Sequence, residues 1–191
     1  MLPLWRQPLA RSLYKTKSHP ESRYLQLATI SSDGLPKNRT LVFRDFDDQS
    51  RLLMFTDNRT AKWREFQHST KAAVCWYIAA TREQYRLEGN VQLITDSIVN
   101  KKAAQERQRR WESLSSAAKQ QFLWGKPKTP RAKHIDLAVS AEMITDTPPE
   151  HFELIAFEVH YVDYLNLRGN PQERIIYSSV NEQWNEDRVI P

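Results

Sequence analysis

Residues 25–62 constrain the fold of this chain more than any other stretch, because they hold three extended runs separated by turn residues. The runs cover residues 25–31, 40–43 and 51–56, and their apolar and β-branched side chains favour strands. Gly34 ends the first turn, since glycine adopts positive φ without steric cost. We therefore predict a three-stranded antiparallel meander in this stretch.

Four cationic side chains lie at the ends of these predicted elements: Arg39, Arg44, Arg59 and Lys62. A helix is predicted to follow, with Asp57 or Thr60 as its cap. Lys62 falls in the first turn, where the helix dipole disfavours a cation and a bound phosphate would compensate. Arg39 and Arg44 reach one ligand only if their strand bulges or ends before Arg44. Taken singly, each cation also fits an ordinary solvated surface position.

The rest of the chain contains further strands joined by helices. Residues 1–24 are typical of an amphipathic arm that packs on the main body. A helix over residues 61–68 places Trp63 and Phe66 on one face, towards the core, and leaves Glu65 in water. The other predicted elements are a strand at 71–78 buried on both faces, a strand at 84–94, helices from Asp96 or Ser97 to about Trp111 and at 113–122, and strands at 152–167, 174–180 and 184–189.

The strand predicted at residues 84–94 alternates between polar and apolar side chains. Its polar face consists of Gln84, Arg86, Glu88, Asn90 and Gln92. A wholly polar face on a long strand lies against water, a ligand or a partner subunit. All three interpretations are open at the level of sequence.

The composition fits one globular domain of 191 residues, with 40% apolar and 27% charged residues. No apolar run approaches the length of a membrane span, and the N-terminus lacks the apolar segment of a secretory signal. Cys75 is the single cysteine, so we expect no intrachain disulfide and a cytoplasmic location. Cys75 lies in an apolar strand, where we expect a buried, inert thiol.

Several common catalytic motifs are absent from the sequence. The four glycines are not spaced as a dinucleotide-binding or Walker loop, so side chains and a helix end must hold any phosphate. The five histidines show no metal-ligand spacing, and no nucleophile elbow is present. We therefore expect no metal, and an organic cofactor as the agent of any chemistry.

The order of these elements, with RTLVFR at 39–44 and FTDNRTAK at 55–62, resembles the pyridoxamine 5'-phosphate oxidase-like FMN-binding split-barrel family. The resemblance is clear over residues 20–95 and looser over 152–191. It implies a mainly β (α+β) fold, an antiparallel split β-barrel with flanking helices. We expect one domain over residues 1–191, with 95–135 as a helical insertion over the barrel. The resemblance also implies a homodimer with FMN at the subunit interface.

Carried over position by position, the resemblance implies roles in FMN binding. Arg39 and Lys62 would hold the phosphate, and Arg44, where the family usually has lysine, would lie near flavin and substrate. Gln84 would reach the flavin ring from the neighbouring subunit, and Arg174 would lie near the ring. The full set of expected cofactor-binding residues is Arg39, Thr40, Leu41, Val42, Arg44, Phe55, Thr56, Arg59, Lys62, Gln84, Leu165 and Arg174.

Some positions depart from the family pattern. Leu165 stands where the oxidases carry tryptophan, and Phe55 replaces a tyrosine beside the phosphate and ribityl chain. One family cation before Lys62 is missing, and Arg59 is the expected substitute. Residues 169–173 lack the Arg-x-His group with which the oxidases bind pyridoxamine phosphate. The small-molecule substrate and the electron acceptor are therefore open.

Three functions are compatible with this pattern. The first is an FMN-dependent oxidoreductase, whose flavin carries the chemistry while Arg174 and Arg44 contribute positive charge. The second is a non-catalytic protein that binds or stores flavin on the same scaffold. The third is a nucleic-acid binder, suggested by the net charge of +5 and the basic run at 101–110. Glu106 dilutes that run and no aromatic residues are interleaved with it, so a solvated helix explains it better. We expect neither a nucleic acid nor a membrane as partner.

Overall fold

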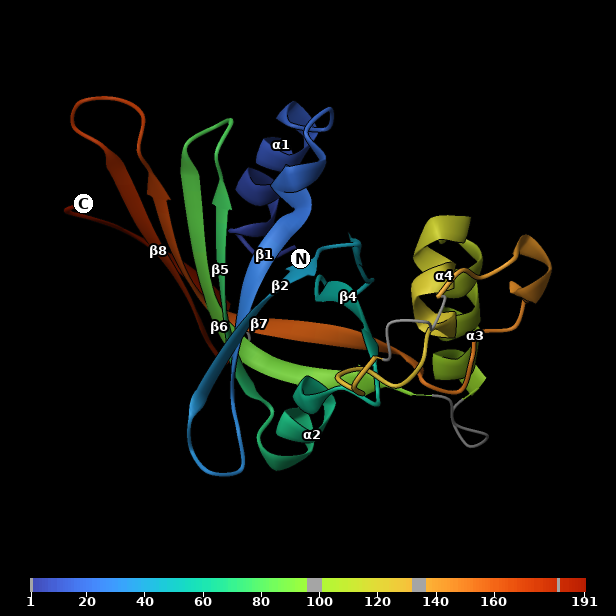
Figure 1. Ribbon diagram of the computed structural model, residues 1–191. Helices are drawn as coiled ribbons and strands as arrows, with labels where there is room; N and C mark the ends of the chain where they lie inside the picture. Colours follow the sequence, from blue (N-terminus) through green and yellow to red (C-terminus); the bar gives the residue numbers. More distant parts are fainter. Residues whose placement is uncertain (1, 96–100, 132–136, 182) are drawn as a thin grey trace.

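The computed structural model describes residues 2–95, 101–131, 137–181 and 183–191. These residues form a curved antiparallel sheet of nine strands with helices packed around it (Figure 1). The helices and strands are α1 (Arg6–Lys15), β1 (Tyr24–Ile30), β2 (Pro36–Val42), β3 (Asp45–Phe46), β4 (Leu52–Asp57), α2 (Ala61–His68), β5 (Lys71–Ile78), β6 (Glu83–Ile94), α3 (Lys101–Glu112), α4 (Ser116–Leu123), β7 (Phe152–Asn166), β8 (Glu173–Val180) and β9 (Gln183–Val189), with short 3-10 helices at Pro20–Arg23 and Ala141–Met143. The mainly β, α+β expectation is confirmed.

The strands are ordered β2-β1-β5-β6-β7-β4-β3, while β8 pairs with β7 and β9 pairs with β8. β1 and β2 form the predicted hairpin, in which Tyr24 lies opposite Val42. β4 pairs with β3 and β7 and not with β2, so the predicted three-stranded meander is wrong. A turn signal identifies a hairpin neighbour, whereas the main partner of β4 lies far along the chain and leaves no local signal.

β7 is the central strand of the sheet. It pairs with β6 from Glu83↔Asn166 to Ile94↔Leu154, and the register shifts between Glu88 and Gly89. The first part of β7 also pairs with β4, and the second part pairs with β8. At the shift a Cβ on Gly89 would lie 1.8 Å from the carbonyl oxygen of Glu158, so only glycine fits between the two strands.

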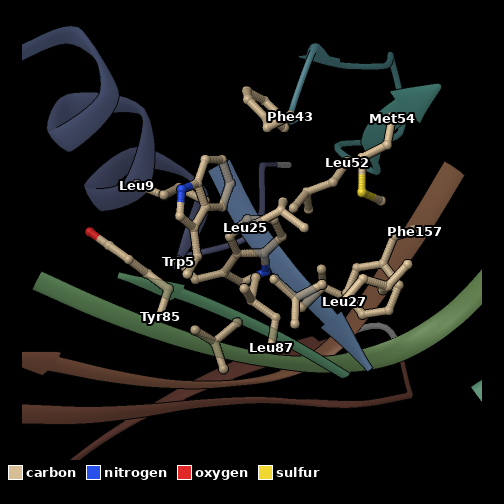
Figure 2. Close-up of a cluster of buried hydrophobic side chains, with 14 of the residues drawn as sticks. Trp5, Leu9, Leu25, Leu27, Phe43, Leu52, Met54, Tyr85, Leu87 and Phe157 are labelled. Carbon is tan, nitrogen blue, oxygen red and sulfur yellow. The ribbon is translucent and has the colours of Figure 1, made fainter. Parts of the chain in front are cut away.

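The main hydrophobic core lies on the inner face of the curved sheet. Figure 2 shows Trp5, Leu25, Leu27, Leu87 and Phe157 directed towards one another, and each is at most 1% exposed. α1 adds Leu9 to this core, which confirms that the N-terminal arm packs on the main body. In Figure 1 α1 and α2 lie towards opposite ends of the sheet.

A second, smaller core joins α3 and α4 to the sheet. Trp111 packs edge-on against Phe152 at a centroid distance of 5.1 Å, and Phe122 packs against both rings. Ser115 caps α4, because its hydroxyl accepts from the Ala118 amide at 3.3 Å. The predicted helix starts Asp96 and Ser97 lie outside the described residues. The two helices stand beside the first part of β7, away from α1 (Figure 1).

The prediction that residues 71–78 are buried on both faces is wrong. Val74, Trp76 and Ile78 are buried, whereas Cys75 is exposed and Tyr77 is 43% exposed. β5 therefore alternates and directs its cysteine outward, so the expected buried thiol is also wrong. Apolar composition alone does not distinguish a strand covered on both faces from one covered on the inner face only.

Candidate functional site

Arg39 belongs to a cluster under α2 that we call the basic cluster, which consists of Arg39, Lys62, Thr29 and Glu65. Arg39 lies opposite Leu27 in the β1–β2 pair, so its side chain points to the inner face of the sheet. Its guanidinium donates to the hydroxyl of Thr29 at 2.5 Å and to the carboxylate of Glu65. Glu65 also accepts from the Thr29 hydroxyl at 2.6 Å, so β1, β2 and α2 meet at one carboxylate.

The start of α2 has the properties of an anion-binding site. Thr60 occupies the N-cap position, but its hydroxyl donates to the Asp57 carbonyl at 2.7 Å, and no side chain caps the helix. The first turn contains no acidic residue and carries Lys62, whose Nζ donates to the Thr60 hydroxyl at 3.0 Å. Burial lowers the pKa of Lys62, and the nearby Arg39 charge lowers it further. Unpaired helix N–H groups beside two neighbouring cations favour a phosphate.

Arg59 points away from this arrangement. Its guanidinium makes a bidentate contact with Asp57, with Nη2 2.6 Å from Oδ2 and Nε 3.0 Å from Oδ1. Burial raises the pKa of Asp57 while the contacts with Arg59 lower it, and the net shift is downward. The guanidinium also reaches the Trp124 carbonyl at 3.4 Å. A role for Arg59 as the third phosphate cation would require this ion pair to open, so it stays a prediction.

Arg44 is placed by the end of β2. The strand stops at Val42, and the Arg44 amide donates to the Leu53 carbonyl at 2.9 Å. The strand therefore ends before Arg44, which is one of the two conditions under which Arg39 and Arg44 could reach the same ligand. The Arg44 guanidinium lies 5.1 Å over the Phe55 ring, and its buried Nε has no partner among the described residues. Burial lowers the pKa of Arg44, and the charge of Arg23 adds to that effect.

The other predicted residues of β2 and β4 divide between the two faces of the sheet. Thr40 and Val42 face outward, whereas Leu41 lies opposite buried Leu25 and packs on the core. Thr56 is 3% exposed on the inner face, and Phe55 points the other way, towards the second core. β2 and β4 therefore each direct side chains to both the inner and the outer face of the sheet.

A second group of predicted residues forms a row across three strands. Gln84 on β6 lies opposite Leu165 on β7, and Leu165 lies opposite Arg174 on β8. We call these three residues the outer row, because their side chains lie on the face opposite buried Tyr85 and Tyr164. The basic cluster lies on the inner face and the outer row on the outer face. One chain therefore keeps Arg39 and Lys62 apart from the three residues of the outer row.

Two acidic residues organise these groups, and the sequence analysis missed both. Glu65 was expected in water, but it is 7% exposed and binds Arg39. Asp163 is 5% exposed, and its carboxylate accepts from Arg174 and Arg86. A lone carboxylate inside the apolar run YVDYL is the sequence signal that would have identified Asp163, since a buried carboxylate requires a partner.

Other expectations of the sequence concern metals, membranes and the basic run at 101–110. Among the described residues no group of histidine, cysteine and carboxylate side chains is placed to hold a metal ion. No helix of the described part is long and apolar enough to cross a membrane.

In α3, Arg109 and Arg110 both pair with Glu106. Arg107 is 3% exposed, and its Nε donates to the Phe152 carbonyl. Arg107, and Arg110 through a further contact with Asp45, attach the helix to the sheet, and the exposed Arg109 is paired within the helix, which weakens the nucleic-acid interpretation.

Comparison with known proteins gives the same family by sequence and by structure. The sequence model described as the pyridoxamine 5'-phosphate oxidase FMN-binding domain matches residues 2–95. A pyridoxine/pyridoxamine 5'-phosphate oxidase 2 from Arabidopsis thaliana is 31% identical over 194 residues, covering 98% of this chain and 96% of the plant protein. A pyridoxine/pyridoxamine 5'-phosphate oxidase from Thermosynechococcus vestitus is 26% identical, covering 90% of this chain and 81% of its own.

Solved structures share the whole fold. A pyridoxamine 5'-phosphate oxidase-related, FMN-binding protein from Nostoc punctiforme superposes with a TM-score of 0.92 at 36% identity and covers all of both chains. PhzG from Burkholderia lata, solved with tetrahydrophenazine-1-carboxylic acid, has a TM-score of 0.73 at 20% identity over 97% of this chain and 91% of its own, which shows the fold alone. The chain therefore belongs to the pyridoxamine 5'-phosphate oxidase family, with its split-barrel fold and its cofactor FMN.

Proposed function

We propose that the protein is an FMN-dependent oxidoreductase that works as a homodimer. The observation that carries this proposal is the basic cluster at the uncapped start of α2, where Arg39 and Lys62 lie together. Glu65 already pairs with Arg39, so a phosphate would compensate chiefly the charge of Lys62 and the uncapped helix N–H groups, with Arg39 beside it as a second donor. The buried Nε of Arg44, which has no partner among the described residues, offers a further donor to a ligand beside Phe55.

The division of the site between two faces supports the dimer. A flavin held by its phosphate at the basic cluster on the inner face cannot also meet the outer row of the same chain without passing through the sheet. A second copy that presents its outer row to the first chain's basic cluster removes this difficulty. Each site then takes phosphate contacts from one subunit and ring contacts from the other, as the family resemblance implies.

The chain's own residues have distinct tasks in this arrangement. FMN, when bound, supplies the hydride and electron transfer chemistry. Arg39 and Lys62 hold its phosphate, and the Gln84 amide offers a donor and an acceptor to the ring. Arg44 and Arg174 place positive charge near the ring, where it favours the reduced, anionic state of a flavin. Leu165, between Gln84 and Arg174, contributes an apolar surface.

The names of the sequence relatives supply candidate substrates. The Arabidopsis and Thermosynechococcus relatives are named for pyridoxine and pyridoxamine 5'-phosphate, so these compounds are tested first. The turn at residues 169–173 contains no arginine and no histidine, which favours a different substrate or a non-catalytic flavin protein as the alternative. The two possibilities differ in whether bound FMN is reduced by a substrate.

Anaerobic mixing of the purified FMN complex with pyridoxamine 5'-phosphate, pyridoxine 5'-phosphate and a panel of other small reductants tests the proposal. We expect one reductant to bleach the flavin absorbance within seconds and oxygen to restore it. Arg39→Ala/Lys62→Ala is the control, because it should lose both FMN and bleaching. An FMN complex that dithionite reduces, but that no compound in the panel reduces, would favour the flavin-storage alternative.

A further inference from the structure

Asp163 holds two arginines from neighbouring strands. Its Oδ1 accepts from Nε of Arg174 at 2.9 Å, and its Oδ2 accepts from Nη2 of the same guanidinium at 2.7 Å. Arg86 reaches Oδ2 with a single, longer contact of 3.2 Å. We call these three residues the Asp163 triad. The carboxylate is 5% exposed, while the side chains of Arg86 and Arg174 are 55% and 31% exposed.

The bidentate contact decides which edge of the Arg174 guanidinium is available. A guanidinium has five N–H donors, and the two parallel bonds to Asp163 use Nε and one N–H of Nη2. Three donors are then left, on the edge that faces away from Asp163. Without the carboxylate the flexible arginine side chain would sample several rotamers, and this edge would have no fixed direction.

The triad also sets the local charge. Two guanidinium groups and one carboxylate give a net charge of about one positive unit, where two arginines alone would give two. Asp163 lies two residues before Leu165 on β7, so this charge sits directly beside the outer row. The contacts with Asp163 raise the pKa of Arg174.

The Asp163 carboxylate is not needed to hold the strands together. β7 already pairs with β6 and β8 through a continuous ladder on both sides of Asp163. A buried ion pair contributes little net stability, because desolvation of the charges offsets their attraction. The bidentate geometry for Arg174 and the weaker contact with Arg86 together indicate that the orientation of Arg174 is what the carboxylate controls.

We propose that Asp163 is a positioning residue that aims the guanidinium of Arg174 at the bound flavin ring and limits the positive charge there. The inference rests on the proposed contact between Arg174 and the ring. It assigns to Asp163 an effect on flavin affinity that is transmitted through Arg174, and a direct effect of its negative charge on the reduction potential.

A double-mutant cycle between Asp163→Ala and Arg174→Gln tests the inference. FMN affinity is measured by flavin fluorescence, and the midpoint potential of bound FMN by reductive titration without substrate. We expect Asp163→Ala to weaken FMN binding about tenfold and to change the potential, because one oriented charged contact is lost. In the Arg174→Gln background the same substitution should leave the affinity unchanged, since Asp163 acts on affinity through Arg174, while the potential keeps the direct effect of the lost negative charge.

Two further variants separate charge and folding from positioning. Asp163→Asn keeps the shape and one acceptor but loses the negative charge, so the potential should move in the positive direction. Arg86→Gln leaves the bidentate contact intact and should change the potential less than Arg174→Gln does. Melting curves of all variants identify any that fail to fold, and Asp163→Asn then serves as the test.

Two results would overturn the inference: unchanged affinity and potential in folded Asp163→Ala and Asp163→Asn, or equal effects on FMN affinity in the wild-type and Arg174→Gln backgrounds. Neither readout requires substrate turnover. A protein that binds FMN but oxidises nothing in the panel therefore contradicts the proposed oxidoreductase function and leaves this inference to be judged on its own measurements.

Discussion

At the scale of single residues, Lys62 has an unusual environment for the first turn of a helix. It is a cation in the first turn of α2, it has lost much of its hydration, and its neighbour Arg39 is also cationic. Each of these three features is unfavourable alone. They become compatible when an anion binds, so Lys62 is the residue at which cofactor affinity should depend most clearly on pH.

We expect Lys62→Met to weaken FMN binding by about one to two powers of ten, as loss of a charged hydrogen bond does. The protonated amine binds phosphate, so its contribution is present at low pH and is lost as pH rises through the pKa of Lys62. Burial lowers that pKa, so the loss begins at a lower pH than for an ordinary lysine. Fluorescence titrations across alkaline pH measure this effect. Lys62→Arg should flatten the profile, and an equally steep profile in Lys62→Met would contradict the assignment.

Gly89 gives a second prediction at this scale. Any Cβ there meets the Glu158 backbone at 1.8 Å, so Gly89→Ala should force β6 and β7 apart and cost about 3 kcal/mol of unfolding free energy. Gly125→Ala is the matched control, because nothing lies within 4 Å of its added Cβ. Urea unfolding of the two variants measures the difference. Equal stability would show that the strands separate at little cost.

At the scale of elements, α3 and α4 depend on a core of their own. Trp111 is fully buried between these helices and Phe152, and its indole N–H donates to the Thr145 carbonyl at 2.9 Å. The main core of the sheet shares none of the four buried members of this cluster. The two helices therefore have the structural basis for a separate unit of local stability.

Trp111→Ala should destabilise this unit by about 3–5 kcal/mol, the usual cost of removing a buried tryptophan. We expect amide protection in α3 and α4 to fall while β1 and β5 keep theirs, as measured by hydrogen exchange. Trp124→Ala is the control, because Trp124 is 42% exposed. Equal loss of protection in β1 and α3 would indicate one cooperative unit instead.

Sequence reasoning identified the elements well and their long-range partners poorly. The hairpin of β1 and β2, the start of α2 and the alternation of β6 follow from turn residues and periodicity, which are local properties. The pairing of β4 with β7 and the outward position of Cys75 depend on residues far away in the chain. No local pattern contains that information.

The candidate site shows the same limit. Arg39, Arg44 and Lys62 could be proposed from the sequence because cations at strand ends and helix starts are visible there. Glu65 and Asp163 were missed because their importance comes from the partners that the fold brings to them. The separation of the basic cluster and the outer row onto two faces appears only when strand register is known.

At the scale of the whole molecule, the two faces predict complementation between defective chains. Arg39→Ala/Lys62→Ala should lack phosphate contacts, and Gln84→Ala/Arg174→Ala should lack ring contacts, so neither variant alone should retain FMN. Heterodimers formed by co-expression should regain one intact site. Random pairing of equal amounts then gives about one FMN per four chains. Absence of recovery in a confirmed heterodimer would place the whole site within one chain.

The position of β7 in the chain has a consequence for how the protein is made. β3 and β4 emerge from the ribosome early, yet their place in the sheet depends on the first part of β7, which is synthesised about 100 residues later. Until then the nascent chain carries the apolar side chains of β4 and the inner faces of β1, β5 and β6 without the strand that joins them. Folding of this sheet therefore waits until β7 has been synthesised, and chaperones that shield apolar surface should engage the nascent chain before then.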